Sequence, residues 1–350
     1  MKAARPFALG FGLAAIAAGC AQAPLGVATP GNPFGVPSQI GIPLPQSATA
    51  HSASYRVASA DTPSLGATLQ TNLAIATSTT ATINTILSNC ARAGLVPGRS
   101  YTFADPGTPG GQVTVLLTVL TDHAVLSIGK GTSATGSTQM ISISYTKPSK
   151  GTAVFHAEHD PAMGRLYVTE TYDADAGYAS IDAMQDATAV ADANSQQKAI
   201  AHWDLIRHDA SASAGATFTL KVAANLVKPQ HPSDNGQVSL TANFLADGSA
   251  AAVVGLSNAG TGNQFKLVPN DGLSWNDPNA GHDLYLSASG QDVTRAQASA
   301  QLRAIAPTGS DLVQPATNDP VQTNAFAGAQ FQFPLIGASV AASASTSLSL

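Results

Sequence analysis

From about residue 101 onward, apolar and polar side chains alternate with a period of two. The segment Ile141–Tyr145 shows this clearly, with Ser142 and Ser144 between apolar neighbours. Such alternation is typical of strands with one buried and one solvated face. Short turn sequences such as Asp160–Gly164 and Asp247–Gly248 join the runs. The predicted strands are 113–120, 124–128, 141–145, 154–159, 165–172, 199–208, 216–227, 237–245, 251–256, 264–268 and 283–287.

Two segments instead carry apolar residues at helical spacing. In the first, Pro63 precedes a stripe that Gly94 and Pro97 end, which predicts a helix over 66–92. Its members recur three or four residues apart: Leu69, Leu73, Ala76, Thr80, Ile83, Leu87 and Cys90. The second segment, 178–197, is also predicted to be helical, from the positions Ile181, Met184, Ala187 and Ala191.

Consecutive strands joined by turns, without repeated intervening helices, favour antiparallel pairing. The predicted fold class is therefore α+β. It is a large, mostly antiparallel curved sheet, meandering or barrel-like, packed by one long N-terminal helix in a single domain over 64–305. The segment 306–350 is rich in Ala and Ser and of low complexity. Phe326, Phe331 and Phe333 give it one candidate edge strand.

The N-terminus has the pattern of a secretion signal. Lys2 and Arg5 form a positive start, and residues 7–18 are apolar and too few to span a bilayer as a helix. Ala17-Ala18-Gly19-Cys20 then resembles the lipobox of bacterial lipoproteins, with Ala17 where that family usually has Leu. The resemblance covers about twenty residues. Ala21-Gln22-Ala23 offers an ordinary cleavage site as the alternative.

This resemblance implies a signal peptide over 1–19 and diacylglycerol (with palmitate-type chains) on the Cys20 thiol. Ala21, rather than Asp, follows the cysteine. By the family's sorting rule, this implies a lipid-anchored protein at the outer membrane of a Gram-negative cell envelope. Six prolines then mark residues 20–63 as an extended tether that follows the anchor: Pro24, Pro30, Pro33, Pro37, Pro43 and Pro45.

Composition narrows the possible partners. Charged residues are only 11% of the 350, against about 25% in an average domain. The formal net charge is −5, so a nucleic-acid partner, which needs clustered Lys and Arg, is not expected. The only cysteines are Cys20 and Cys90. A lipidated Cys20 would leave Cys90 without an intrachain partner, and its place on the helical stripe favours a buried, inert thiol.

The sequence lacks the serine-hydrolase elbow and the motifs of nucleotide-binding proteins and zinc proteases, so no catalytic residue and no cofactor is assigned. Asp173–Gly177 begins like a calcium loop but lacks its final Glu and is predicted to be a surface turn. Histidines and carboxylates do gather on the predicted strands. If the strands 154–159 and 199–208 pair, they would form a nitrogen and oxygen metal site from His202, Asp204, His208, His156 and Glu158.

The leading functional hypothesis is a lipid-anchored envelope protein that acts as a non-enzymatic binding or structural module. Its partner beyond the membrane would be an envelope protein, a lipid or a glycan. One alternative is an envelope hydrolase or metalloenzyme that uses the His and Asp cluster, which requires those side chains to converge. The other is a lipid carrier with an apolar cavity between sheet and helix.

Overall fold

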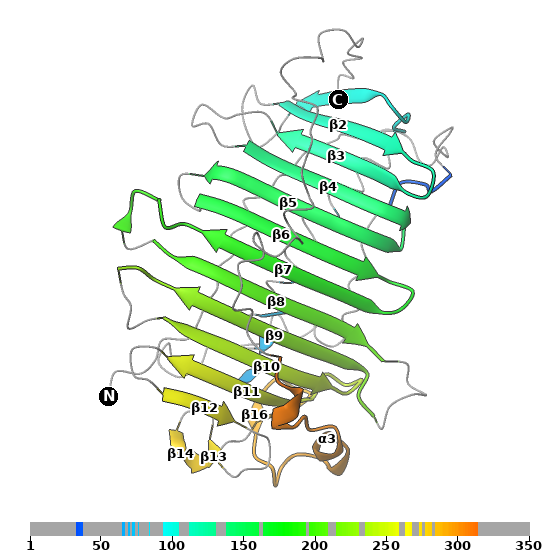
Figure 1. The fold of residues 1–350 in the computed structure, drawn as a ribbon. Helices are drawn as coiled ribbons and strands as arrows, with labels where there is room; N and C mark the ends of the chain where they lie inside the picture. The colour runs from blue at the N-terminus through cyan, green and yellow to red at the C-terminus, as the bar shows by residue number, and fades with distance from the viewer. Residues whose placement is uncertain are drawn as a thin grey trace.

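The computed structural model of the chain shows one large antiparallel sheet (Figure 1). The structure describes residues 33–37, the separate positions 65, 66, 69, 70, 72, 73, 76 and 84, and the ranges 94–104, 112–130, 138–160, 164–193, 196–208, 215–230, 235–258, 263–267, 273–274, 277–281 and 284–313.

The first eleven strands form a meander in which each strand pairs with the next along the chain. They are β1 Ser100–Ala104, β2 Gln112–Val119, β3 Ala124–Lys130, β4 Thr138–Lys147, β5 Lys150–Asp160, β6 Gly164–Asp173, β7 Tyr178–Asp186, β8 Lys198–Arg207, β9 Phe218–Val227, β10 Gly236–Phe244 and β11 Ala250–Asn258.

The far edge of β11 is shared between two strands. β15 (Tyr285–Leu286) pairs with the start of β11, and β12 (Asn263–Leu267) pairs with its end. β16 (Asp292–Val293) then pairs with β15. The remaining described elements are the hairpin of β13 (Leu273–Ser274) and β14 (Asp277–Gly281), the helix α3 (Ala300–Ala304) and the 3-10 turn η4 (Gly309–Asp311).

The predicted α+β class is wrong. Among the described residues, the sheet has 14 strands, whereas the complete helical elements are one five-residue α-helix and one 3-10 turn. No long N-terminal helix is seen among the described residues. The sheet is also an open meander rather than barrel-like, with β1 at one edge and β16 at the other. The fold is mainly β, because the first eleven strands pair one after another along the chain and the described connections between them contain no α-helix.

The segment 178–197, predicted to be helical, begins with strand β7. Ile181 and Ala183 are buried on one face of the sheet, and Met184 is buried on the other. A strand with apolar residues on both faces loses the period of two, so its short apolar run is easily taken for a helix.

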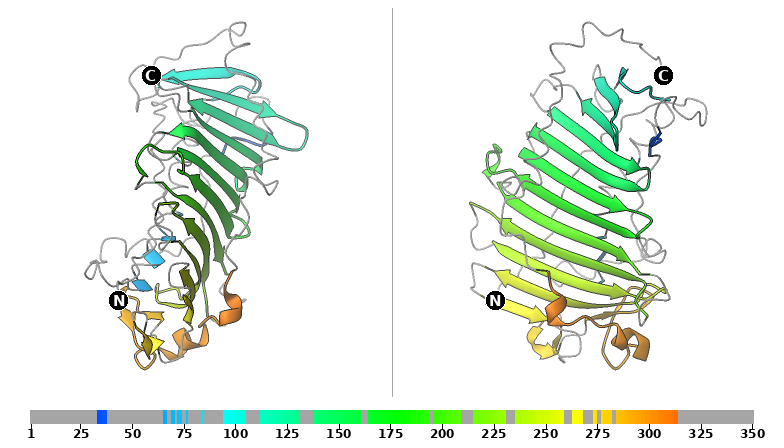
Figure 2. Two further views of the ribbon diagram at one scale, coloured as in Figure 1. Left: turned by 60° about the vertical axis from the view of Figure 1, so that its left-hand side comes forward. Right: turned by 45° about the vertical axis from the view of Figure 1, so that its right-hand side comes forward.

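The main core lies on one face of the sheet. Trp203 of β8 is among its largest fully buried side chains, and the indole Nε1 donates to Asn72 Oδ1 at 3.2 Å. Leu69, Leu73 and Ala76 are buried in the same cluster. The helical stripe therefore located core residues correctly, although Ile83, Leu87 and Cys90 lie outside the residues whose side chains are described. Figure 2 shows the described parts of this N-terminal segment on one side of the sheet and α3 on the other.

Hydrogen bonds fix the N-terminal segment at both edges of the sheet. The carboxylate of Asp292 in β16 accepts the backbone N–H of Leu65 at 2.8 Å and that of Gly66 at 2.9 Å. At the other edge, the Gly98 N–H donates to the carbonyl of Leu117 in β2 at 2.8 Å. The described positions between these ends pack on the apolar face, which the segment therefore helps to cover.

Part of the predicted tether also packs on the sheet. Phe34 and Val36 are partly buried and pack against the main core. In a free linker, both side chains would be fully exposed. Gly35 has a φ of +67°, and a Cβ built on it would lie 3.6 Å from Pro148 Cγ. Residues 33–37 therefore contact the turn between β4 and β5, so the packed unit includes chain that precedes residue 64.

The C-terminal segment crosses the opposite, polar face. Ser239, Thr241 and Asn243 of β10 donate side-chain hydrogen bonds to the backbone carbonyls of Val313, Asp311 and Ile305, respectively. Beneath it lies a second, smaller core of Leu245, Ala251, Tyr285, Ala298, Leu302 and Ile305. The packed unit thus extends past residue 305, while the candidate edge strand around Phe326–Phe333 lies outside the described residues.

Gly151 offers a test of how closely the apolar face is packed. It lies between its cross-strand partners Tyr145 and Tyr172, and a Cβ there would come within 2.5 Å of the Ser144 carbonyl oxygen. We expect Gly151→Ala to lower the free energy of unfolding by about 2–3 kcal/mol, because backbone would have to shift. Denaturant unfolding measures this.

Gly255→Ala is the matched control, because it is also a strand glycine. Its Cβ would first meet the end of the flexible Leu312 side chain, at 3.3 Å. The Gly255 variant should be destabilised much less. Equal losses at the two glycines would contradict the packing described at Gly151.

Candidate functional site

A charged cluster lies on the polar face, where β7 pairs with β8. Asp182 is directly opposite His202, and Ser180 is directly opposite Asp204. These residues alternate with core residues such as Ile181 and Trp203. Because successive side chains on a strand point to opposite faces, burying the apolar set places the polar set together on the other side.

The imidazole of His202 is held between two carboxylates. His202 Nδ1 lies 2.8 Å from Asp182 Oδ1, and Nε2 lies 3.2 Å from Asp204 Oδ2. The Tyr178 hydroxyl donates to Asp204 Oδ1 at 3.0 Å. The side chains of His202 and Asp204 are 23% and 18% exposed, against 44% for Asp182, so the cluster opens to solvent on the Asp182 side.

This arrangement favours the charged form of His202. Hydrogen bonds to Asp182 and Asp204 raise the pKa of His202 to about 10, against the opposing effect of burial. Burial also opposes ionisation of Asp204, but hydrogen bonds and charge from His202 outweigh it and hold the pKa of that carboxyl below its usual range. Burial, followed by the nearby carboxylates, raises the pKa of Tyr178.

An imidazolium with both ring N–H groups donated to carboxylates has little catalytic use. It has no lone pair to offer a metal ion, and near neutral pH it neither takes up nor releases a proton readily. The cluster acts chemically as a partly buried ionic clamp, in which one cation is shared by two anions.

The predicted metal ligands are only partly brought together. His202 and Asp204 are neighbours, but β5, which carries His156, pairs with β4 and β6 and not with β8. Two intervening strands put β5 and β8 about 14 Å apart. The pairing on which the predicted site depended is therefore absent. Among the described residues, no group of three or more His, Cys, Asp or Glu side chains is placed to hold a metal ion.

The other predicted ligands have separate environments. The His156 ring stacks on Tyr167 with centroids 4.3 Å apart and planes 21° apart. His208 Nε2 lies 2.8 Å from the Thr219 hydroxyl. The backbone of Glu158 is opposite Thr138 in β4, and its side chain lies outside the described residues.

Sequence reasoning missed Asp182 and Tyr178. Both lie in the segment predicted to be helical, so neither was considered together with the strand that carries His202. The available signal was the alternation of Tyr178, Ser180 and Asp182 with apolar Ala179, Ile181 and Ala183, which has the strand period of two.

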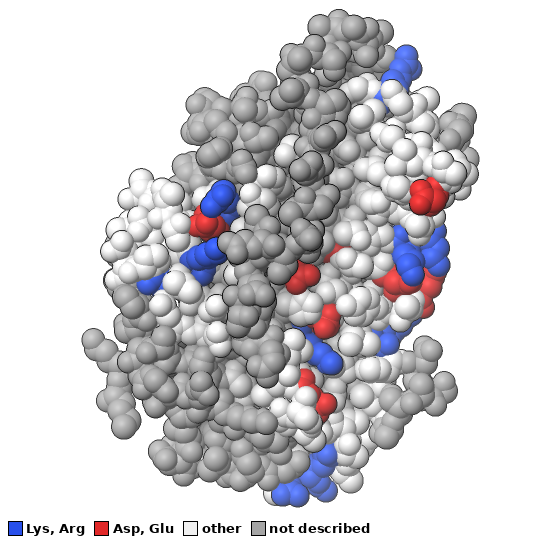
Figure 3. Space-filling view, viewed as in Figure 1, with Lys and Arg blue, Asp and Glu red and all other residues white. Residues whose placement is uncertain are grey.

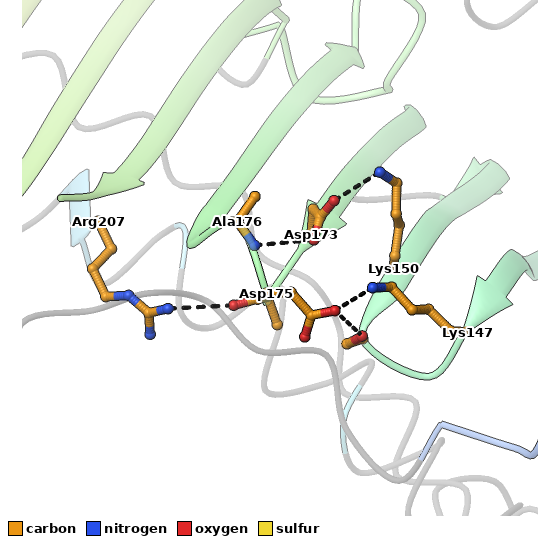
Figure 4. A network of polar contacts seen from close by, with 8 residues as sticks. Lys147, Lys150, Asp173, Asp175, Ala176 and Arg207 are labelled. Atoms are coloured by element: carbon orange, nitrogen blue, oxygen red, sulfur yellow. Dashed lines mark hydrogen bonds and ion pairs between the residues drawn. The ribbon is translucent and has the colours of Figure 1, made fainter. Parts of the chain in front are cut away.

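A second polar network surrounds the β4–β5 and β6–β7 turns (Figure 4). Lys147 pairs with Asp175, and Lys150 Nζ lies 2.7 Å from Asp173 Oδ2. Asp173 also accepts the Ala176 N–H at 3.1 Å. Hydrogen bonds from the two lysines, first among several causes, lower the pKa of both carboxyls. The segment 173–177 is thus the surface turn that its sequence predicted.

No family model matches the chain, and no curated protein or solved structure matches it either. Within the described residues, none of the helices has the length and apolar character needed to cross a membrane.

The raised pKa of His202 predicts a pH-dependent stability. Because it is raised in the folded state from 6.5 to about 10, the stabilisation is complete below pH 6.5 and is lost as pH rises towards 10. We expect a loss on the order of 2–4 kcal/mol across this interval. Urea unfolding at a series of pH values measures it.

Comparison with variants isolates the contribution of His202. In His202→Gln, the part of the decline due to this imidazole should disappear, with lower stability at pH 6.5. His208→Gln, which removes a histidine bonded to the Thr219 hydroxyl, should keep the wild-type decline. If the wild type and His202→Gln lose stability in parallel, the ionic clamp does not exist as described.

Proposed function

We propose that this protein is a lipid-anchored cell-envelope protein whose sheet acts as a non-enzymatic binding or structural module. The observation that carries the proposal is the state of His202, whose two ring nitrogens are both engaged by carboxylates. The ionisable groups of this cluster are thus paired with one another, one cation between two anions, instead of being poised for chemistry. This favours a scaffold over a hydrolase or metalloenzyme.

The polar face has the character of a recognition surface for uncharged partners. Thr152 of β5 and Thr171 of β6 lie directly opposite each other, and their hydroxyls are 3.4 Å apart. Hydroxyl groups both donate and accept hydrogen bonds and carry no charge. A surface of this kind suits a glycan or an uncharged protein surface of the envelope.

The apolar face supports a scaffold over a lipid carrier. Leu65, Leu69 and Leu73 of the same chain are buried against it. A carrier would need an apolar cavity of several hundred cubic ångströms. Here the side chains of the sheet are in contact with residues from the N-terminal segment instead.

The location at the envelope rests on the lipobox-like sequence that ends at Cys20. We expect the wild-type chain, expressed in a Gram-negative host, to fractionate with the outer membrane. Its N-terminal peptide should carry the mass of a diacylglyceryl group on Cys20. Cys20→Ser should abolish both the lipid mass and the membrane association, because the serine hydroxyl cannot replace the thiol in the thioether bond.

Cys90→Ser is the matched control for the loss of a thiol. It should keep the diacylglyceryl mass and the membrane fraction of the wild type. A mature N-terminus at Pro24, or an unmodified Cys20 in the membrane fraction, would overturn the proposed anchor.

A further inference from the structure

We propose that one corner of the sheet rests on the lipid surface in which Cys20 is anchored. This anchor-side corner is formed by Val96, Leu120 and the β4–β5 turn with Lys147, Pro148 and Lys150. The inference rests on the proposed lipid anchor, and it adds which part of the molecule meets the membrane and through which side chains. Three independent observations point to this corner.

The first is where the chain from the anchor reaches the sheet. Gly35 lies against Pro148, so the N-terminal chain meets the sheet at the β4–β5 turn. Residues 21–33 alone separate Cys20 from Phe34. At about 3.1 Å per residue, as expected for an extended Pro-rich tether, these residues would span at most about 40 Å. A ten-residue strand is about 33 Å long, so of the two sides of the sheet, the one at the β4–β5 turn is the one that the anchored chain reaches first.

The second observation is the distribution of exposed apolar side chains. Among the described residues, the large apolar side chains that are exposed are Val96 at 40%, Leu120 at 45% and Val227 at 40%. Leu120 follows the end of β2, where its N–H donates to the His123 carbonyl in the β2–β3 turn. Val96 lies beside that end, because Gly98 bonds to Leu117 of β2.

These two apolar residues and the β4–β5 turn share one side of the sheet. Even-numbered strands of the meander end there, so the β2–β3 and β4–β5 turns are neighbours two strand spacings apart, about 10 Å. Val227 ends β9, an odd-numbered strand, and so lies at the opposite side. Two of the three exposed apolar side chains therefore lie in the corner that the anchor reaches.

The third observation is charge. Lys147 and Lys150 flank Pro148, and each lysine is paired with a carboxylate of the β6–β7 turn (Figure 4). Figure 3 shows basic and acidic side chains gathered together at the right-hand margin of the molecule. Asp122, the acid next to Leu120, lies 2.7 Å from His123 Nδ1. Two lysines and three carboxylates therefore meet at this corner, and the ion pairs offset most of the negative charge that would repel anionic lipid.

Exposed apolar side chains beside lysines are the combination that binds at the lipid headgroup boundary. The apolar groups enter the outer part of the acyl region, while the paired lysine and aspartate side chains stay at the level of the headgroups. Val96 and Leu120 are too few to bind a membrane alone. With the chain already held by a lipid anchor, they need only orient it.

Tryptophan quenching by brominated lipid tests this orientation. Leu120→Trp and Val227→Trp place the same probe at two exposed apolar positions, one in the corner and one on the opposite side. The acylated chain is placed in phosphatidylethanolamine and phosphatidylglycerol vesicles with or without brominated acyl chains. Emission is compared with that of the parent chain, which reports Trp203 and Trp275. We expect the added emission to fall about twofold for L120W and to change little for V227W.

The design separates this proposal from that of the native anchor. If Cys20 proves not to be acylated, the proposed function fails, and the same variants are coupled through the Cys20 thiol to maleimide-headgroup lipid in Cys90→Ser chains. Selective quenching of L120W supports the corner with either attachment. Equal quenching of the two variants, stronger quenching of V227W, or no quenching of either overturns it.

Discussion

The structure depends on covering the apolar face of a sheet that, in the described part of the chain, stays open and is not stacked on a second large sheet. Sheet-forming sequences usually bury such a face against another layer. Here the chain supplies the cover from its own N-terminal segment. Leu65, Leu69 and Leu73 pack into the main core, and the backbone at Leu65 is tied to Asp292, 227 residues later in the chain. The first and last parts of the domain therefore stabilise each other.

The need to cover the apolar face is met in different ways at the two ends of the sheet. At the edge formed by β15 and β16, short strands and a second core around Leu302 and Ile305 complete the sheet. At the β4–β5 turn, it is instead the chain leading from Cys20 that makes contact, where Gly35 lies against Pro148. The segment that would connect the protein to the membrane is thus partly incorporated into the fold, which limits how freely the sheet can turn relative to an anchor.

The sequence predicted individual strands and core residues better than it predicted the proportions of helix and strand in the whole fold. The strand segments around β4, β6 and β8 were found, because one face of each is apolar and the other polar. Leu69, Leu73 and Ala76 were correctly assigned to the core from helical spacing. The α+β class failed because periodicity does not show how much of a chain each element will occupy. β7 was missed because apolar residues on both of its faces conceal the strand period.

Only the β8 half of the candidate site was predicted, because β7, which carries the other half, was taken for a helix. His202 and Asp204 were placed on one strand face, but their partners came from β7, which was predicted to be a helix. Which strands pair is a property of the whole meander, and no spacing within 199–208 contains it. The proposed pairing with 154–159 assumed that strands rich in His and acid meet. In the fold, β6 and β7 lie between them.

The position of the ionic clamp suggests what it contributes to folding. A slip of β8 by one residue against β7 would turn His202 and Asp204 towards the apolar face and Trp203 towards solvent. Desolvating these two charged groups would add to the cost of exposing a large apolar side chain. In the native register, the charges instead stabilise one another at 2.8 and 3.2 Å. The cluster therefore penalises misregistered pairing at the middle of the meander, where no sheet edge or tight β-hairpin turn fixes the alignment of β7 with β8.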